Sequence, residues 1–356
     1  MTKRIAIALS GGVDSAVAAL LLKKSGAEVF ALFMKNWEDD DTESGCHDKE
    51  DLFAAVAVAD RLGLELEVVN FAAEYKAQVF TPFLSALRGG LTPNPDVLCN
   101  AAIKFGVFAE RARQLGATAI ATGHYARTRQ IDGAWQLLKG EDSAKDQSYF
   151  LHRLSAAQLA SAVFPLGSWH KADTRAAAHD AGLHNWARKD STGICFVGKR
   201  HFADFVGRYL SAQPGAMATP EGKVVGEHCG LAFYTIGQRQ GLGIGGAKGP
   251  WFVAAKRPAD NVLIVVSGES HPLLYASRTQ IIDAHWIAEK PPPTKWVYAA
   301  RLRHRQPPAS CFLSRADEQT AEIVFAQPQR SPAPGQYAVI YDGNICLGGG
   351  VIESAA

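Results

Sequence analysis

The sequence lacks closely spaced cysteines. It has six cysteines in 356 residues, and no two of them form a Cys-x-x-Cys pair. This absence argues against a zinc ribbon and against the disulfide scaffold of a small secreted domain. We therefore expect a cytoplasmic protein with reduced thiols. The cysteines are Cys46, Cys99, Cys195, Cys229, Cys311 and Cys346.

Long apolar runs and a strong net charge are also missing. The first apolar run, from Ile5 to Leu9, stops at Ser10 and is shorter than the roughly 7–15 residues of a signal-peptide core. No uncharged stretch reaches the ~18 residues of a membrane span, so we expect no membrane contact. The net charge is only +2, so a nucleic-acid surface would have to be a local patch.

The first 125 or so residues alternate between short apolar strands and helices. This alternation predicts βαβ crossovers and an α/β fold, with a parallel sheet that helices cover on both faces. Strands are predicted at Arg4–Leu9, Glu28–Met34, Leu64–Phe71 and Ala117–Ala121, and helices at Ala16–Lys24, Asp51–Leu62, Ala72–Leu87 and Asn100–Leu115.

The pattern changes after His124. A hairpin is predicted at Tyr125–Leu138, helices return from about Ser155 to Tyr209, and a Gly-rich, strand-like stretch follows. The last third shows short strands and turns, which indicate a small barrel or sandwich. Since a single core rarely grows past 250–300 residues, we predict three domains, at residues 1–210, 211–277 and 278–356.

The segment Ser10-Gly11-Gly12-Val13-Asp14-Ser15 follows a predicted strand and opens a helix. Glycines let backbone N–H groups approach phosphate oxygens, and a helix N-terminus adds partial positive charge. The segment has neither the Gly-Lys-Ser/Thr of a Walker loop nor a G-x-G-x-x-G fingerprint. The alternative interpretation is an ordinary tight turn between strand and helix.

This loop resembles the pyrophosphate loop of the ATP pyrophosphatase family, which splits ATP into AMP and pyrophosphate and adenylates a substrate oxygen. The resemblance implies that Asp14 positions Mg²⁺ or polarises the pyrophosphate. Met34 ends the second predicted strand and Gly123 follows the fourth, at the same sheet edge; Met34 could pack on adenine, or simply belong to the core. The expected ATP-binding residues are Ala8, Leu9, Ser10, Gly11, Gly12, Val13, Asp14, Ser15, Met34 and Gly123.

Two cysteines occupy polar Pro/Gly segments that favour a thiolate. Cys99 lies at the predicted start of a helix, whose N-terminus stabilises negative charge. Cys195 lies in a Gly-bearing loop close to Lys199 and Arg200. The other candidates, Cys229, Cys311 and Cys346, sit among apolar residues and are expected to be core residues.

Eight ordered segments extend the resemblance from about residue 5 to about residue 352: SGGVDS, FMKNW, TPNPDVLCN, ATGHYA, KDQSYFL, DSTGICFVGKR, TIGQRQGLGIGG and CLGGG. Together they resemble the bacterial tRNA-specific 2-thiouridylase family. This resemblance implies a nucleotide-hydrolase-like N-terminal domain with a helical tRNA-binding extension, a central β-rich domain and a C-terminal β-barrel. It implies a tRNA-uridine 2-sulfurtransferase that uses ATP and Mg²⁺, with no metal ligands assigned in the protein.

In that family mechanism, the C2 oxygen of the wobble uridine is adenylated. Cys195 carries a persulfide received from an upstream sulfur donor, and Cys99 attacks it, leaving a transient Cys99–Cys195 disulfide that a reductant reopens. Asp96 would act as a general base or bind the uracil edge; an Asx turn is the alternative. The family usually has a charged pair where this chain has Ala101-Ala102, which leaves open how side chains activate Cys99.

The basic run Arg301-Leu302-Arg303-His304-Arg305 is a candidate RNA surface. If it is a strand, the three arginines share one face and could follow phosphates; a solvated edge strand is the alternative. His124 could contact RNA or be a structural histidine. The resemblance implies contacts with the anticodon region of tRNA from Asn94, Pro95, Asp96, His124, Lys145, Asp146, Gln147, Arg303, His304, Arg305 and Gln336.

Three other functions fit parts of the pattern. A pyrophosphate-loop amidating synthetase would share the fold but use no redox cysteines. A non-catalytic tRNA-binding protein would carry an inactive loop. An iron–sulfur cluster on Cys99, Cys195 and Asp96 would have an unusually small ligand set.

Overall fold

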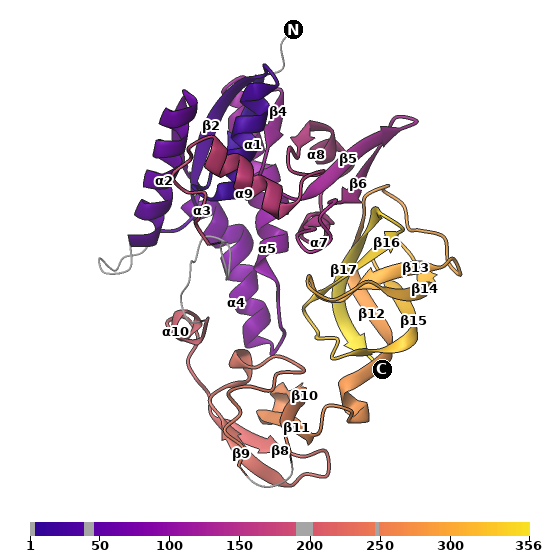
Figure 1. Ribbon diagram of the computed structural model, residues 1–356. Helices are drawn as coiled ribbons and strands as arrows, with labels where there is room; N and C mark the ends of the chain where they lie inside the picture. The colour runs from indigo at the N-terminus through magenta and orange to yellow at the C-terminus, as the bar shows by residue number, and fades with distance from the viewer. Residues whose placement is uncertain (1–3, 39–45, 190–201, 246–248) are drawn as a thin grey trace.

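The computed structural model describes residues 4–38, 46–189, 202–245 and 249–356. Its strands form a five-stranded, a four-stranded and an eight-stranded sheet, which lie in three separate regions of the molecule (Figure 1). This arrangement confirms the predicted fold class: an α/β N-terminal region, a small β-rich region and a C-terminal β-barrel. Within the described ranges, no helix is both long and apolar enough to cross a membrane.

The five-stranded sheet is parallel throughout, with the order β3-β2-β1-β4-β7. The direction of winding reverses between β1 and β4, and open parallel sheets bind ligands at the carboxyl ends of strands at such a point. The strands are β1 (Arg4–Ala8), β2 (Glu28–Lys35), β3 (Leu66–Asn70), β4 (Ala119–Ala121) and β7 (Ala162–Val163).

Helices cover both faces of this sheet, as expected for strands of nearly continuous apolar sequence. Along β2, Ala31 and Phe33 pack on one face while Leu32 and Met34 pack on the other. The first, here named the α1 face, is covered by α1 (Val13–Lys24), α2 (Cys46–Leu62) and α9 (Lys171–Asp180). The second, the Cys99 face, is covered by α3 (Ala72–Tyr75), η1 (Lys76–Phe80), α4 (Thr81–Arg88), α5 (Pro95–Leu98), η2 (Cys99–Val107) and α6 (Phe108–Gln114).

The helix that carries Cys99 begins earlier than predicted. Its N-cap is Asn94, whose Oδ1 accepts a hydrogen bond from the Asp96 backbone N at 3.2 Å, and Pro95 occupies the first helical position. Cys99 therefore follows a complete first turn instead of opening the helix. The prediction that Cys99 opens the helix was therefore wrong, and the field of a helix N-terminus acts mainly within the first turn.

The four-stranded sheet has the order β10-β11-β8-β9 and encloses its own small core. Leu263 of β11 and Met217 of β8 are paired in register and fully buried there. The strands are β8 (Gly215–Ala218), β9 (Val224–His228), β10 (Trp251–Arg257) and β11 (Val262–Ser267), and short helical turns lie at η3 (Leu231–Phe233), η4 (Pro258–Asp260) and η5 (Pro272–Leu274).

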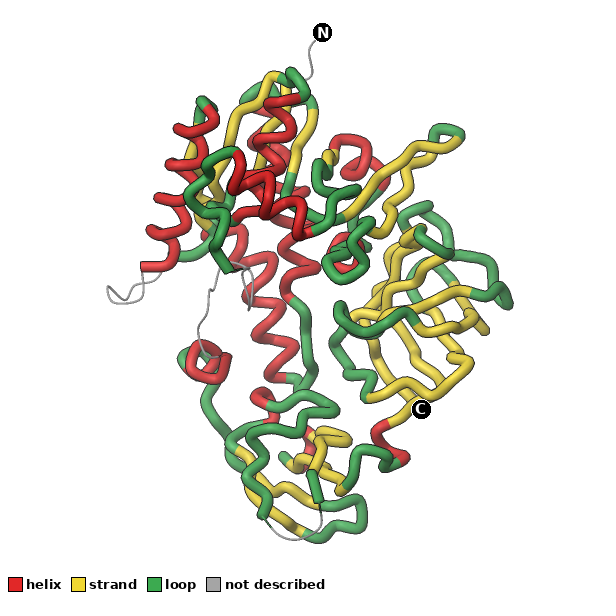
Figure 2. The backbone as a smooth tube through the Cα atoms, viewed as in Figure 1, coloured by secondary structure: helices red, strands yellow, loops and turns green. Residues whose placement is uncertain are grey.

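The C-terminal strands close into a barrel because β12 pairs with both β15 and β17. The strands are β12 (Tyr275–Trp286), β13 (Tyr298–Arg301), β14 (Ala309–Ala316), β15 (Ala321–Arg330), β16 (Tyr337–Asp342) and β17 (Ile345–Ala355). The predicted hairpin is confirmed as β5 (Ala126–Ile131) and β6 (Ala134–Lys139), and β6 pairs with β17. An N-terminal hairpin thus extends the C-terminal sheet (Figure 2).

The remaining helices are short and precede the four-stranded sheet, and the first of them begins before the helical stretch predicted from about Ser155. They are α7 (Ser148–Leu151), α8 (Ala156–Ser161) and α10 (Phe202–Gly207).

Candidate active site

The Ser10–Ser15 loop connects β1 to α1 in a tightly held turn. Ser15 Oγ donates to the Gly12 carbonyl at 3.0 Å and accepts from the Ser10 backbone N at 3.2 Å. Gly11 has φ of +74°, and a Cβ there would lie 2.4 Å from the Asp51 carbonyl oxygen. The first N–H groups of a helix have no acceptor within it, so this turn has the geometry of an anion site.

Gly123, at the end of a second strand, lies in close contact with the loop. It follows β4, and a Cβ at this position would lie 2.7 Å from the Ser15 backbone N and 2.8 Å from the Asp14 carbonyl carbon. The structure therefore places Gly123 beside the loop, at the reversal point of the sheet. Met34 is 6% exposed and packs in the same core as Cys99, so its side chain belongs mainly to the interior.

Asp14 is held by two groups from distant segments. Lys171 Nζ lies 2.7 and 2.9 Å from its two carboxylate oxygens, and the Tyr125 hydroxyl donates to it at 2.9 Å. Lys171 is the first residue of α9, which packs beside α1 (Figure 1). Lys171 was not among the predicted site residues, because a single lysine 157 residues from Asp14 carries no local signal.

The loop is also fixed from outside by the segment after α9. The Gly11 carbonyl accepts hydrogen bonds from Asn185 Nδ2 at 2.9 Å and Arg188 Nη1 at 3.3 Å. Arg188 also pairs with Asp51 on α2. These contacts bring two cationic side chains, Lys171 and Arg188, to the predicted phosphate loop.

Of the two predicted catalytic cysteines, Cys99 is fully buried in the core of the Cys99 face. Cys195 and its loop lie outside the described residues. Asp96 is half-buried in the first turn of α5, and the Asx cap there is made by Asn94, not by Asp96.

The other cysteines divide into two kinds. Cys311 and Cys346 are buried as expected, and burial raises the pKa of each thiol to about 12. Cys229 is exposed, so the prediction that it is a core residue was wrong. Its Sγ lies 3.6 Å from the Tyr234 hydroxyl at the end of the short η3 turn.

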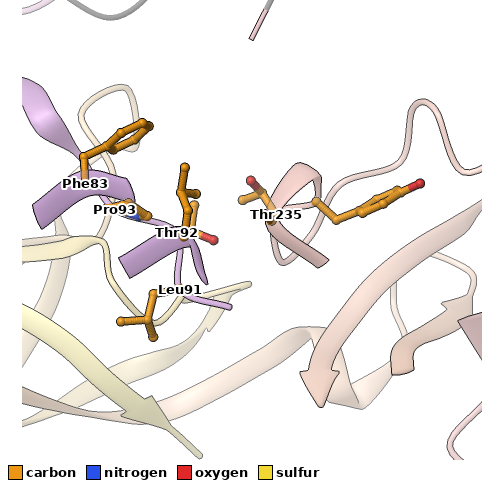
Figure 3. Close-up of a pocket in the computed structure, with 8 residues that line it drawn as sticks. Phe83, Leu91, Thr92, Pro93 and Thr235 are labelled. Carbon is orange, nitrogen blue, oxygen red and sulfur yellow. The ribbon is translucent and has the colours of Figure 1, made fainter. Parts of the chain in front are cut away.

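A cavity of about 190 Å³ lies next to the segment that carries Asn94 and Asp96. Figure 3 shows Phe83, Leu91, Thr92 and Pro93 on one side and Thr235 of the β-rich region opposite. Thr92 is also bonded to the barrel, because its N donates to the Pro334 carbonyl at 2.8 Å. All three regions of the molecule therefore meet immediately before Asn94.

Gln336, a predicted tRNA contact, takes part in this junction. Its Nε2 donates to the Thr92 carbonyl at 2.9 Å.

Asp146 and Gln147, also predicted to contact tRNA, make contacts within the protein. Asp146 is 2% exposed and accepts from Arg301 Nη1 at 2.7 Å and from the Gly140 backbone N at 3.0 Å. Gln147 Oε1 accepts from the backbone N of Tyr125 at 3.0 Å. The Asp146–Arg301 ion pair joins the N-terminal region to the barrel.

The basic run from Arg301 to Arg305 is not a strand along its length, so its three arginines do not share one strand face. Strand β13 ends at Arg301, which is buried against Asp146, and the chain then turns. Arg303 donates to the carbonyls of Ile236 and Ser331 at 2.8 and 2.7 Å, and burial lowers its pKa. Of the three arginines, Arg305 is the exposed one. Arg303 bonds two carbonyl groups inside the protein, so the period-two pattern of the sequence does not place it on an exposed strand face.

The two predicted RNA-binding histidines are largely buried. His304 Nε2 lies 3.0 Å from the Asp146 carbonyl and its ring lies 4.3 Å from that of Phe150. His124 Nδ1 lies 2.7 Å from Thr122 Oγ1. Burial lowers the pKa of both rings, so both are neutral near pH 7. Lys145, in the segment before Asp146, is half-buried.

Three family models match consecutive parts of the chain. They are described as the tRNA methyl transferase HUP domain (residues 3–199), the tRNA methyl transferase PRC-barrel domain (203–267) and the aminomethyltransferase beta-barrel domain (277–352).

Full-length relatives share more than half of their residues with this chain. A tRNA-specific 2-thiouridylase MnmA of Methylobacillus flagellatus is 55% identical over 359 residues, covering 100% of both chains. That of Bordetella petrii is 54% identical, covering 98% of this chain and 96% of the relative. Among solved structures, an NMN synthetase from Francisella tularensis aligns with 17% identity and a TM-score of 0.35, over 58% of this chain and 72% of that one.

Proposed function

Because the chain belongs to the tRNA-specific 2-thiouridylase family, we propose that it replaces the C2 oxygen of the tRNA wobble uridine with sulfur at the expense of ATP. The observation that carries this proposal is the fixed loop from Ser10 to Ser15, with Lys171 and Arg188 beside it. We assign catalysis to residues 1–210 and place the enzyme in the cytoplasm.

In the first step, the uridine O2 attacks the α-phosphorus of ATP, and the bond to pyrophosphate breaks. The loop N–H groups and the Lys171 ammonium are positioned to stabilise charge on the departing pyrophosphate. Tyr125 holds Asp14 in place through the hydrogen bond from its hydroxyl. AMP on O2 then provides a leaving group that a uracil oxygen lacks.

Mg²⁺ fits this site as a companion of ATP. The cation prefers one or two carboxylates together with phosphate oxygens, and Asp14 is the carboxylate within the loop. No cluster of three or more His, Cys, Asp or Glu side chains that could hold a metal is found in the described ranges. Asp14 would hold the ion together with the phosphates, and the ion would neutralise charge on the triphosphate.

The second step is sulfur transfer. Cys195 carries a persulfide from an upstream donor, and the Cys99 thiolate attacks the Cys195 sulfur that bears the terminal sulfur. Hydrosulfide departs as the Cys99–Cys195 disulfide forms, and it attacks C2 to displace AMP. An external dithiol then reduces the disulfide to two thiols.

RNA would approach along the Asn94–Asp96 segment, since Cys99 follows it on the same helix. The uridine must leave the anticodon stack to reach the loop. Asp96 would face the uracil, as general base or as hydrogen-bond acceptor. The exposed Arg305 would contribute a phosphate contact. Lys145, Gln336 and the other residues predicted to contact tRNA would lie near the bound RNA.

Nucleoside mass spectrometry tests the proposal after incubation with tRNA, ATP, Mg²⁺ and a persulfide donor. We expect the wild type to produce a uridine with one O→S exchange. Cys99→Ser and Cys195→Ser should abolish that product, while Cys195→Ser still releases pyrophosphate. The matched control is Cys229→Ser, since Cys229 is an exposed thiol in the β-rich region. A wild type without the sulfur product would refute the function.

A further inference from the structure

We infer that Asn36 recognises the edge of a nucleobase in this site, an assignment that rests on the proposed function. Asn36 follows β2 and is 1% exposed. Neither Nδ2 nor Oδ1 of its side chain has a hydrogen-bond partner. No other side chain in the described part of the chain has two buried polar atoms in this condition.

A buried amide without partners is costly for the folded protein. It gives up its bonds to water and receives nothing in return, and native proteins contain few such groups. Two other buried asparagines show the usual arrangement. Asn100 Nδ2 donates to the Phe150 carbonyl and Asn185 Nδ2 to the Gly11 carbonyl, so each amide is at least partly satisfied.

The strand register locates Asn36 at the ligand edge of the sheet. Ala8 of β1 pairs with Leu32, and the Leu9 backbone N donates to the Leu32 carbonyl. Met34 is therefore level with Ser10, the first residue of the phosphate loop. Asn36 lies two residues further along, about 7 Å beyond that level.

The alternation of β2 determines the side of the sheet on which Asn36 lies. Leu32 and Met34 face Cys99, and pairing of β2 continues to Lys35, whose carbonyl accepts from Phe71 N at 2.8 Å. Continued alternation directs Asn36 to the Cys99 face. Trp37, packed edge-on against Phe80 with ring centroids 4.7 Å apart, keeps the backbone in this position.

A carboxamide offers a donor and an acceptor side by side, which is the complement of a nucleobase edge. Asn pairs in this way with the amino group and a ring nitrogen of adenine, and the N3–H and O4 of uracil present the same kind of pattern. The proposed reaction brings both bases to this edge of the sheet. The shared chemistry is therefore an amide–nucleobase pair, with ATP or the target uridine as its source.

Asn36→Leu removes both polar atoms and keeps a side chain of four heavy atoms branched at Cγ. In the ATP arm, calorimetry compares ATP with purine riboside triphosphate, which lacks the 6-amino group. In the RNA arm, pyrophosphate release compares an anticodon stem-loop carrying uridine with one carrying N3-methyluridine. We expect the wild type to discriminate on the order of tenfold in one arm and the variant to lose that discrimination.

Thr279→Val is the matched control, because Thr279 is fully buried with an unpartnered hydroxyl in the barrel. Both substitutions should keep or raise the unfolding temperature, and only Asn36→Leu should change base selectivity. Asn36→Ala provides a second variant if the leucine impairs folding.

Loss of selectivity in the ATP arm assigns adenine, and loss in the RNA arm assigns uracil. If Asn36→Leu keeps the base selectivity of the wild type in both arms, the inference is overturned, and Asn36 is an amide satisfied by a buried water. The ATP arm needs no RNA, so it tests Asn36 even if thiolation fails. If the wild type thiolates tRNA and Asn36→Leu has the same base selectivity, only the role of Asn36 is refuted, and the proposed function stands.

Discussion

The two faces of the parallel sheet differ in whether their polar side chains are hydrogen-bonded within the protein. On the α1 face, Asp14 accepts hydrogen bonds from both Lys171 and Tyr125. On the Cys99 face, the buried Asn36 amide directly follows β2 and has no partner. The same sheet therefore carries one polar group that the protein itself satisfies and one that it does not.

This difference separates two tasks of a binding site. Charges held in advance stabilise an anion without reorganisation, which suits the invariant triphosphate. An unsatisfied amide lowers stability until a complementary group binds, so it can discriminate between ligands that offer that group and ligands that lack it. The α1 face is thus suited to binding phosphate and the Cys99 face to selecting a base.

Substitution of Lys171 should have the largest effect on this comparison. Lys171→Met leaves the Asp14 carboxylate uncompensated beside the triphosphate, and we expect pyrophosphate release to fall on the order of 100-fold to 1,000-fold. Lys171→Arg should recover part of the rate because it restores the charge. Lys24→Met, at an exposed lysine of α1, serves as control. Unchanged release would show that Lys171 only anchors α9.

Gly123 tests the close contact between the two strand ends at the loop. In Gly123→Ala the new Cβ would lie 2.7 Å from Ser15 N, against backbone that cannot easily move. Accommodating the added Cβ should cost about 1–3 kcal/mol. If ATP binding bears that cost, the KM for ATP should rise roughly 10-fold to 100-fold. Gly207→Ala, where nothing lies within 4 Å of the added atom, should leave KM unchanged. An equal KM for ATP in both variants would show that the loop backbone can move away from the added Cβ.

Acid should have a smaller, graded effect through a buried histidine, His152, whose ring packs against Tyr149 and the barrel residue Tyr337. Burial lowers the pKa of His152 to about 3, whereas the unfolded chain titrates near 6.5. The unfolded state therefore binds more protons between these values, and stability falls as pH decreases below 6.5. The loss approaches about 1.4 kcal/mol per pH unit for this one group.

Urea unfolding between pH 7 and pH 5 measures this slope. His152→Asn should flatten it, because the amide can keep the bond to the Tyr149 carbonyl without titrating. His179→Asn, at an exposed position on α9, should not change the slope. Equal slopes in all three proteins would show that other groups cause the acid sensitivity.

Much of the fold was predictable because its signals are local. The apolar runs at β1 and β2, the glycines of the Ser10–Ser15 loop and the Asp132-Gly133 hairpin turn each fix the backbone within a few residues. The start of the Cys99 helix was misplaced although its signals were also local. Asn94 followed by Pro95 is a strong start signal, and it places Cys99 after the first turn.

The site was only partly predictable, because several of its groups come together through tertiary contacts. Nothing near Lys171 or Arg188 in the sequence points to the loop that they contact. The same is true of Arg303, whose charge suggested RNA while its position requires it to bond two carbonyls.

The sequence by itself determined the α/β class, the order of its three regions and the tight strand–helix loop from Ser10 to Ser15, because periodicity and turn residues act over short distances. Only the tertiary structure decided which charges surround that loop, which arginines are exposed and which amide remains unsatisfied. Those properties depend on groups more than 100 residues apart meeting in a low-dielectric interior, where each polar atom must find a partner or lower the stability of the fold.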